Sequence, residues 1–277
     1  MLLVLTHAAV LVSFCTQIGS AQSKETRFDA VRAIISEFNR VAFVGLGELH
    51  SGVADSEFRK KLIRDREFCR KVNDIVVEFA NPLYQSVLDR FVNGEDLPPS
   101  ETDVPHSKLK VWQTGTQLQS AIYEELIDTV RAVNFGLPAD GRLRVVAGFS
   151  RSNVEVIRRE VLDKHHKALF IFGSRHFIRN SPHSLISLLD ENDVGARWFV
   201  VASAGGRDVP AAIASHTATP SNPVLLPTNG TIGKVYAGYL LLDYNHTWDQ
   251  SPGRVTLEQV IDAILYFGAA PIERKYR

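Results

Sequence analysis

The chain has 277 residues with 31 acidic and 31 basic side chains, so its formal net charge is zero. No basic stripe interrupts this balance, and the electrostatic footprint of a nucleic-acid-binding protein is therefore missing. Hydrophobic residues make up 45% of the chain, which is ordinary for a globular protein with a full core.

The first 21 residues have the pattern of a secretory signal peptide. Residues 1–21 contain no Asp, Glu, Lys or Arg, and the apolar run at 8–12 is followed by small residues up to an expected cut after Ala21. This run is too short for a spanning helix, which needs about 20 apolar residues. We therefore expect an exported protein, periplasmic or secreted, with no transmembrane segment in its mature part.

Residues 22–277 are expected to form one α/β domain, because no Pro/Gly/Ser-rich linker divides them. Removal of the signal takes Cys15 away and leaves Cys69 alone, so the mature chain cannot form an internal disulfide. An exported protein without disulfides fits a bacterial periplasmic or secreted enzyme.

Apolar strands alternate with helical segments in the first half of the chain. We expect strands over 41–45, 75–77 and 143–148, where short apolar runs end in glycine or in a polar residue, and helices over 28–38, 58–70, 84–92 and 117–134. The Pro- and Gly-containing segment 93–110 is expected to be a long loop.

The alternation continues in the second half. We expect a helix that begins with a capping box at Ser152 and runs to Leu162, strands over 168–172, 198–202 and 239–242, a helix over 185–189, a weakly ordered stretch through Pro227, and a last helix from Thr256. This order predicts an α/β fold whose mainly parallel or mixed central sheet has helices on both faces.

Polar side chains follow three of the expected strands. Glu48 and His50 follow the first strand, Glu78 follows the second, and Arg175 and His176 follow the strand at 168–172. Ligands of open α/β sheets bind outside the carboxyl ends of the strands, so we expect these side chains to form the site.

Two histidines and two carboxylates at one edge are compatible with two kinds of chemistry. His50, His176, Glu48 and Glu78 would suit a divalent metal such as Mn, Zn or Fe, which would polarise a water molecule. Without metal, a carboxylate would orient His50, which would remove a proton from water attacking an ester or amide. The plainer alternative for Glu78 is a helix cap or an ion pair with Arg59.

Two competing motifs are incomplete. The segment 45–50 has His50 where a dinucleotide-binding fingerprint needs its third glycine. The segment 148–152 lacks the last glycine of a nucleophile elbow, which argues against a serine hydrolase.

The segments 47–52, 76–80, 111–114 and 171–176 resemble erythromycin esterase-like proteins and the wider superfamily that includes the haem-binding lipoprotein ChaN and the TIKI and TraB proteases. The likeness covers most of residues 22–277 and rests on short motifs such as Gly-Glu-Leu-His at 47–50 and Gly-Ser-Arg-His at 173–176.

The resemblance implies that His50 is a general base supported by Glu48 and Glu78, that Arg59 is the family's basic residue, and that His176 stabilises charge or holds a metal. Two features depart from the family pattern. Gly173 stands where many esterase-like members have another histidine, and the helical insertion between the two halves is missing, so the compact length is nearer to ChaN or TIKI members.

Our sequence-based hypothesis is therefore an exported hydrolase of a small-molecule or peptide substrate, with Arg175 in substrate binding and either no cofactor or a divalent metal. One alternative is a haem- or metal-binding ChaN-like protein without catalysis, for which Tyr84, Tyr123 and His106 are available. Another is a catalytically inactive member of the superfamily.

Overall fold

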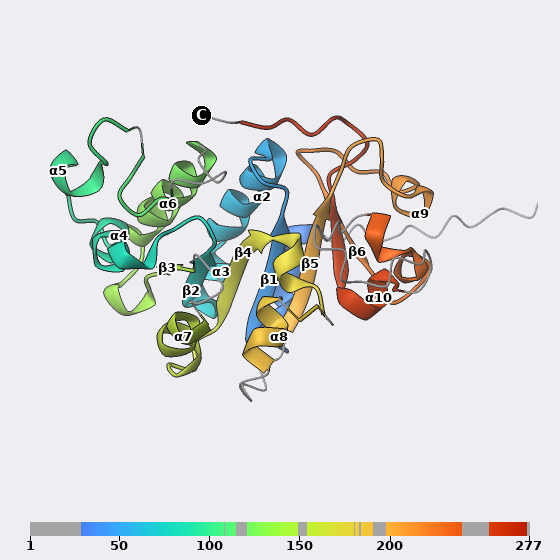
Figure 1. Cartoon of the computed structure of the whole chain (residues 1–277), viewed down its shortest axis with the longest axis horizontal. Coiled ribbons are helices and arrows are strands. Elements are labelled where there is room, and N and C mark those ends of the chain that lie inside the picture. The colour runs from blue at the N-terminus through green and yellow to red at the C-terminus, as the bar shows by residue number, and fades with distance from the viewer. Residues whose placement is uncertain are drawn as a thin grey trace, which may run out of the picture.

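The computed structural model describes residues 29–107, 109–114, 121–148, 154–179, 181–182, 184–190, 198–239 and 255–275, and within them seven strands form one sheet. The strands are β1 (Phe43–Glu48), β2 (Asp74–Val77), β3 (Arg144–Ala147), β4 (Ala168–Gly173), β5 (Trp198–Ala204), β6 (Val224–Pro227) and β7 (Ala263–Tyr266). Their order is β3-β2-β4-β1-β5-β7-β6, and all neighbours are parallel except β6 and β7 (Figure 1). The predicted α/β fold with a mixed sheet is confirmed.

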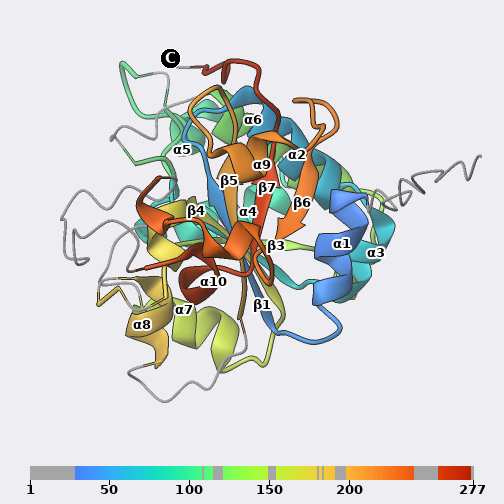
Figure 2. The same ribbon diagram turned by 90° about the vertical axis from the view of Figure 1, so that its right-hand side faces the viewer.

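Helices cover both faces of this sheet (Figures 1 and 2). The helices of the first half pack in one core: α1 (Ala30–Glu37), α2 (Val53–Ile63), α3 (Arg66–Lys71), α4 (Gln85–Val92) and α6 (Ala121–Asn134). Those of the second half pack in the other: α7 (Val154–Ile157), α8 (Leu185–Asp190), α9 (Ala211–Ala214) and α10 (Leu257–Val260). None of the described helices has the length and apolar character that crossing a membrane requires.

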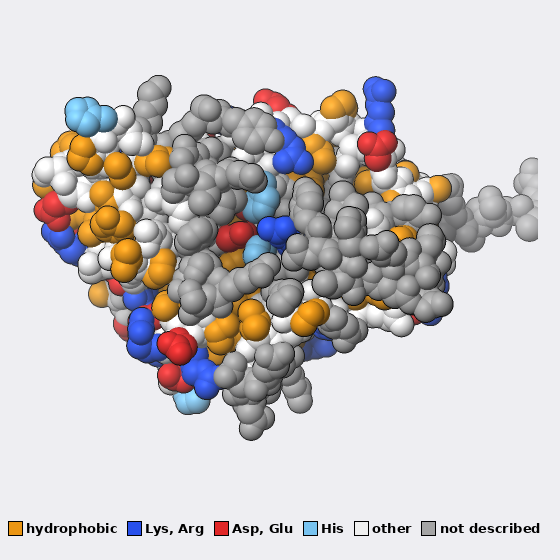
Figure 3. Space-filling view, in the orientation of Figure 1, with side chains coloured by type: hydrophobic (Ala, Val, Ile, Leu, Met, Phe, Trp, Pro, Cys, Tyr) orange, Lys and Arg blue, Asp and Glu red, His pale blue; other side chains and the backbone are white. Residues whose placement is uncertain are grey.

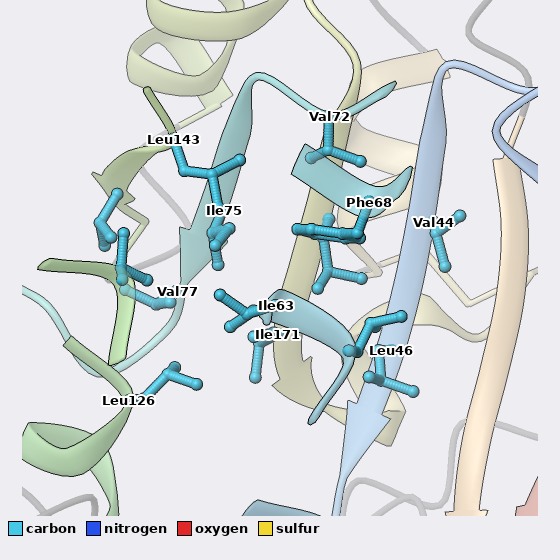
Figure 4. Close-up of a cluster of buried hydrophobic side chains, with 14 of the residues drawn as sticks. Val44, Leu46, Ile63, Phe68, Val72, Ile75, Val77, Leu126, Leu143 and Ile171 are labelled. Carbon is cyan, nitrogen blue, oxygen red and sulfur yellow. The ribbon is translucent and has the colours of Figure 1, made fainter. Parts of the chain in front are cut away.

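Alternation along the strands explains the two cores. Val44 and Leu46 of β1 belong to the first core, shown in Figure 4, whereas Phe43 belongs to the second. On β4, Leu169 and Ile171 again alternate with neighbours on the opposite face. Both faces of the central strands are buried, which is why their sequences are almost continuously apolar.

The insertion of β4 between β1 and β2 places the candidate site. The chain passes from β1 to β2 and β3 with its helices on one face, and then returns to lay β4 between β2 and β1. Glu48 of β1 is paired in register with Gly173 of β4, and Val77 of β2 with Ile171. The carboxyl ends of these three strands therefore meet at one edge of the sheet.

Several expected elements of the first half differ in the structure. The single helix expected over 58–70 is instead the pair α2 and α3, because Asp65 accepts a hydrogen bond from Glu67 N at 2.7 Å and begins a new helix. The segment expected to be a long loop, 93–110, contains the helix α5 (Pro99–Thr102), whose first position holds a proline that favours helix starts.

The second half contains more regular structure than predicted. The stretch expected to be weakly ordered contains α9 and the antiparallel edge strand β6, and β7 follows the short helix α10. Residues 237–239 form a 3-10 turn, so the strand predicted to begin there is wrong at its start, and 240–242 lie outside the described residues. Phe28, the stretch 117–120 and the Ser152 capping box also lie outside them.

Candidate functional site

Alternation along the strands sends the two carboxylates to opposite faces of the sheet. Glu48 follows Val44 and Leu46 at two-residue spacing on β1, so its side chain points to the same face of the sheet. There it lies under α2 and α6. Glu78 extends β2 by one residue, since its N–H donates to Ile171 O at 3.1 Å, and its side chain lies beside the 3-10 turn Ser174–Phe177. His50 follows β1 and lies between these two groups.

Glu48 is a buried carboxylate with every oxygen engaged. Its side chain is 1% exposed, Oε1 accepts hydrogen bonds from His50 Nδ1 at 2.8 Å and from the Tyr123 hydroxyl at 2.9 Å, and Oε2 pairs with the Arg59 guanidinium. Burial raises the pKa of a carboxyl group, but Arg59 and His50 outweigh that effect and lower the Glu48 pKa to about 2. Glu48 is therefore ionised and accepts hydrogen bonds only.

Arg59 reaches Glu48 because α2 begins soon after β1 and crosses the end of that strand. The guanidinium is 2% exposed, and its Nε donates to Asp55 O at 3.2 Å. Burial lowers the pKa of a guanidinium, but the neighbouring Glu48 and Asp55 carboxylates raise the Arg59 pKa overall. This pairing argues against the ion pair between Glu78 and Arg59 that the sequence left open, since Arg59 is the partner of Glu48.

Asp55 fixes the segment that carries His50. Its Oδ2 accepts a hydrogen bond from Leu49 N at 2.7 Å, and its Oδ1 accepts one from the Ser203 hydroxyl of β5 at 3.2 Å. The carboxyl is 1% exposed, and burial together with the Glu48 charge raises its pKa, although Arg59 opposes the shift. Asp55 thus connects α2, β5 and the residue before His50.

His50 presents one ring nitrogen to Glu48 and the other to the edge of the sheet. Because Glu48 is ionised, the hydrogen bond at Nδ1 requires a proton on that atom, which leaves the Nε2 lone pair free in the neutral ring. The side chain is 40% exposed. Burial lowers the pKa of an imidazole, but the Glu48 and Glu78 carboxylates raise the His50 pKa overall.

The backbone around His50 is held from two sides. Ser51 lies in the left-handed region with φ of 61°, which turns the chain sharply after His50. The segment that follows β7 runs alongside, with Arg274 Nη1 donating to His50 O at 2.7 Å and Lys275 N donating to Ser51 O at 2.9 Å. Nothing in the sequence indicated this contact, because more than two hundred residues separate the partners.

Glu78 and His176 form the second half of the site. Glu78 Oε2 accepts a hydrogen bond from Gly173 N at 2.8 Å, and Oε1 lies 3.0 Å from His176 Nε2. Burial raises the Glu78 pKa, but His176, the Gly173 N–H and His50 together lower it. The His176 contact has ion-pair distance but not hydrogen-bond geometry, so this buried nitrogen keeps an unused hydrogen-bonding position among the described residues.

Gly173 leaves room for the free nitrogen of His50. A Cβ atom built at Gly173 would lie 2.8 Å from His50 Nε2 and 3.7 Å from Glu78 Oε2. Any side chain at this position would displace the imidazole. The absence of a side chain thus lets His50 Nε2 approach the backbone of β4 beside the Glu78 carboxylate. Figure 3 shows histidine, acidic and basic side chains gathered at the centre of one face of the molecule.

Three residues offer ligand atoms at metal-binding spacing. One atom each of Glu48, His50 and Glu78 lies within 4.8 Å of the others. Both Glu48 oxygens are already occupied, and the Arg59 guanidinium beside them repels a cation, so Glu48 is a poor ligand. His50 Nε2 and the Glu78 carboxylate are the better donors for a borderline divalent metal, and His176 lies against Glu78 without belonging to the group of closely spaced ligand atoms.

The remaining candidates lie at different depths. Arg175 is exposed on the same 3-10 turn as His176, so it is placed at the edge of the site. Tyr123 is 1% exposed and stacks on Phe79 with ring centroids 4.5 Å apart. Tyr84 is 39% exposed at the end of a 3-10 turn, and His106 is exposed with φ of 60°.

The sequence interpretation missed the roles of Tyr123 and Asp55. Tyr123 lies on the buried face of α6, where an aromatic residue at helical spacing is indistinguishable from ordinary core. Asp55 lies in the first turn of α2, where an acidic residue is expected for helix stability alone. No local signal separates either residue from its structural role.

Comparison with known proteins identifies no family. No family model matches the chain, and no curated protein matches it. Among solved structures, a Bacillus cereus protein matches with a TM-score of 0.55 and 10% identity over 89% of this chain and 93% of its own. A succinoglycan biosynthesis protein matches with a TM-score of 0.51 and 8% identity over 86% of this chain and 90% of its own.

ChaN of Campylobacter jejuni, solved with cofacially bound haem, matches with a TM-score of 0.41 and 12% identity over 62% of this chain and 85% of its own. At these identities the likeness of the first two structures shows that the chain shares their fold. The chemistry of the site has to be argued from its own residues.

The depressed Glu48 pKa predicts a specific acid sensitivity. The folded-state value of about 2 lies below the usual 4.5, so ionised Glu48 stabilises the fold above pH 4.5, and this contribution is lost as the pH falls towards 2. Glu48→Gln should therefore lower the free energy of unfolding by about 3 kcal/mol near pH 7, and by much less near pH 3.

Urea unfolding of both proteins at the two pH values measures this difference. Exposed Glu155→Gln is the matched control and should change stability by less than about 0.5 kcal/mol at either pH. An equal gap between wild type and Glu48→Gln at both pH values would contradict the assigned role of Glu48.

Proposed function

We propose that the chain is a hydrolase of ester or amide bonds in which His50 activates water. The observation that carries the proposal is the two-sided arrangement of His50. Its Nδ1 donates to ionised Glu48, and its Nε2 lies against Gly173, where the lack of a side chain permits the approach. A neutral imidazole fixed in this tautomer by a carboxylate is the arrangement of a general base.

The proposed reaction begins with removal of a proton from water by His50. Water beside His50 Nε2 gives up a proton to that nitrogen, while its oxygen forms a bond with the carbonyl carbon of the substrate. Glu48 stabilises the resulting imidazolium. The tetrahedral intermediate then collapses with cleavage of the ester or amide bond, and His50 returns the proton to the departing alcohol or amine.

Charge that develops on the carbonyl oxygen needs a donor, and the turn after β4 carries two cationic or donor side chains with different roles. His176 has an unused position at Nε2, and Arg175 is exposed beside it. We assign His176 to stabilisation of this oxygen and Arg175 to binding of an anionic group on the substrate, which is a small molecule or a peptide. Preorganised donors of this kind lower the barrier of acyl transfer.

A divalent metal is the second candidate, favoured by ligand atoms of Glu48, His50 and Glu78 that lie within 4.8 Å of one another. His50 Nε2 and Glu78 would hold it, with His176, 3.0 Å from Glu78, as a further donor, and Zn, Mn or Fe would supply a polarised water molecule. Glu48 would then orient His50 from its Nδ1 side, as carboxylates commonly do for metal-bound imidazoles.

Haem binding without catalysis is the rival function, and the buried Tyr123 removes one of its three candidate ligands. The Tyr123 hydroxyl already donates to Glu48. ChaN binds haem, but its TM-score with this chain is too low to transfer that property. Absence of a Soret band after addition of haem to the purified protein would exclude this rival.

The remaining parts of the proposal rest on the sequence. We propose that residues 1–21 are a signal peptide, that residues 22–277 form a single exported domain, and that the chain is a distant relative of the erythromycin esterase-like and ChaN superfamily. The described part of the chain contains Cys69 as a half-buried free thiol. Burial raises the pKa of this thiol, which makes it a poor nucleophile.

Replacement of His50 tests the general-base role. His50→Ala should lower kcat/KM for para-nitrophenyl acetate by about a hundredfold or more, because proton transfer by a positioned base contributes about that factor. His216→Ala, a histidine far along the chain on the partly exposed turn after α9, is the control and should leave the rate unchanged. The wild-type rate should fall with decreasing pH through an apparent pKa above about 6.5, since only neutral His50 accepts a proton.

Gly173→Ala should impair the site without unfolding the protein. The added Cβ would lie 2.8 Å from His50 Nε2, so the imidazole must move, and we expect a loss in kcat/KM of about tenfold or more. Gly230→Ala is the matched control, because a Cβ there meets nothing within 4 Å. Equal rates for both variants and wild type would show that Nε2 does not face the reacting water.

Elemental analysis distinguishes the two candidate mechanisms. Inductively coupled plasma mass spectrometry on purified wild type and His50→Ala should find stoichiometric metal that the variant loses, if His50 is a ligand. Wild type that is active and metal-free would instead establish His50 as an organic base.

A further inference from the structure

A separate cavity lies on the other side of the His50 segment. Its volume is about 520 Å³, and it lies between the start of α1, one side of α2 along its length, the turn before β6 and the segment that follows β7. None of Glu48, His50, Glu78 and His176 lines it. Preformed cavities that bind small molecules have volumes of roughly 300 to 1,000 Å³, so this one has the size of a ligand site.

The walls of the cavity are apolar and firmly held. Phe58 and Phe267 are 5% and 3% exposed and pack edge to face with ring centroids 6.3 Å apart. Ile272 and Ala270 close the side formed by the segment after β7. That segment is anchored to α2 by Val53 N, which donates to Glu273 O at 2.9 Å. Such walls favour a ligand with an apolar body, since apolar surface is then removed from water.

The acidic side chains that line the cavity are mostly engaged elsewhere. Asp29 accepts a hydrogen bond from Val31 N at 3.0 Å, Asp55 accepts from Leu49 and Ser203, and Glu57 lies 2.6 Å from Lys60. The exposed Glu273 is the remaining carboxylate.

Two cations lie on one face of α2 at the rim. Lys61 and Arg64 are three residues apart, both exposed, and both line the cavity. Arg64 Nη2 donates to Thr129 Oγ1 at 3.3 Å, which still leaves other guanidinium donors. The charge left for a ligand on the α2 side of the rim is therefore positive.

We propose that this cavity binds a small amphiphilic anion, with its apolar body against Phe58, Phe267 and Ile272 and its acidic group at Lys61. A carboxylate, sulfonate or phosphate head would satisfy the same contacts. The proposal is independent of the hydrolase function, because it uses no residue of the candidate catalytic site.

Two fluorescent probes with the same apolar rings test the proposal. Anilinonaphthalene sulfonate carries an anionic head, and phenylnaphthylamine lacks it. The full-length protein should bind the sulfonate at one site and more tightly than the uncharged probe. Lys61→Glu should weaken sulfonate binding by about tenfold or more, because it replaces attraction with repulsion, and should leave the uncharged probe within about twofold.

Two further variants locate the binding site. Ala270→Trp places a large side chain at a lining position and should weaken both probes. Arg32→Glu, an exposed cation on α1 that does not line the cavity, should weaken neither. His50→Ala should also bind the sulfonate normally, which separates this cavity from the catalytic site.

Normal sulfonate binding by Lys61→Glu or by Ala270→Trp overturns the proposal, as does lost binding in His50→Ala. Equal affinity of the wild type for the two probes overturns the anionic preference. All substituted positions except His50 are exposed, and thermal unfolding curves that match wild type confirm that loss of binding is local.

Discussion

The charge of Glu48, buried at the end of the central strand, is the constraint on which the rest of the site depends. A carboxylate removed from water destabilises a protein by several kcal/mol unless it is paired and hydrogen-bonded. Arg59, Tyr123 and His50 satisfy it from three different elements. The hydrogen bond from His50 thus helps to stabilise the buried Glu48 charge. The same hydrogen bond holds the His50 ring in one orientation, although its side chain is 40% exposed.

The order of the strands brings the paired Glu48 and His50 close to Glu78. Because β4 lies between β1 and β2, Glu48 and Glu78 are separated by a single strand, and alternation sends them to opposite faces. Gly47 permits this arrangement, since a Cβ there would lie 2.7 Å from the Ser174 Cα, so only glycine lets the turn that carries His176 pack directly on β1. The free nitrogen of His50 therefore lies between two halves that belong to different cores.

The sequence contains enough information to place the strand ends, and therefore Glu48, His50, Glu78 and His176 at one edge. It does not contain the partner of each residue. Arg59 is eleven residues from Glu48, and its choice of Glu48 over Glu78 follows from the face on which α2 packs. The sequence analysis did not predict the strands β6 and β7. Each has only four residues and lies near Pro, Gly or Thr, so neither shows a clear alternation of apolar and polar side chains. The Asp65 cap that divides α2 from α3 was visible in the sequence and was overlooked.

Gly173 bears on whether this is an active site or a degenerate one. From the sequence alone, a glycine in place of an expected histidine at this position left an inactive scaffold as one alternative. In the structure, this glycine is required by the position of His50. A Cβ at 173 would lie 2.8 Å from His50 Nε2, so a histidine at this position and His50 in its present orientation exclude one another. With glycine, His50 keeps its carboxylate partner, Glu78 keeps the Gly173 N–H, and His176 keeps an unused nitrogen. Each carboxylate therefore has its own histidine, His50 for Glu48 and His176 for Glu78, and removal of either partner would leave a buried charge that weakens the fold.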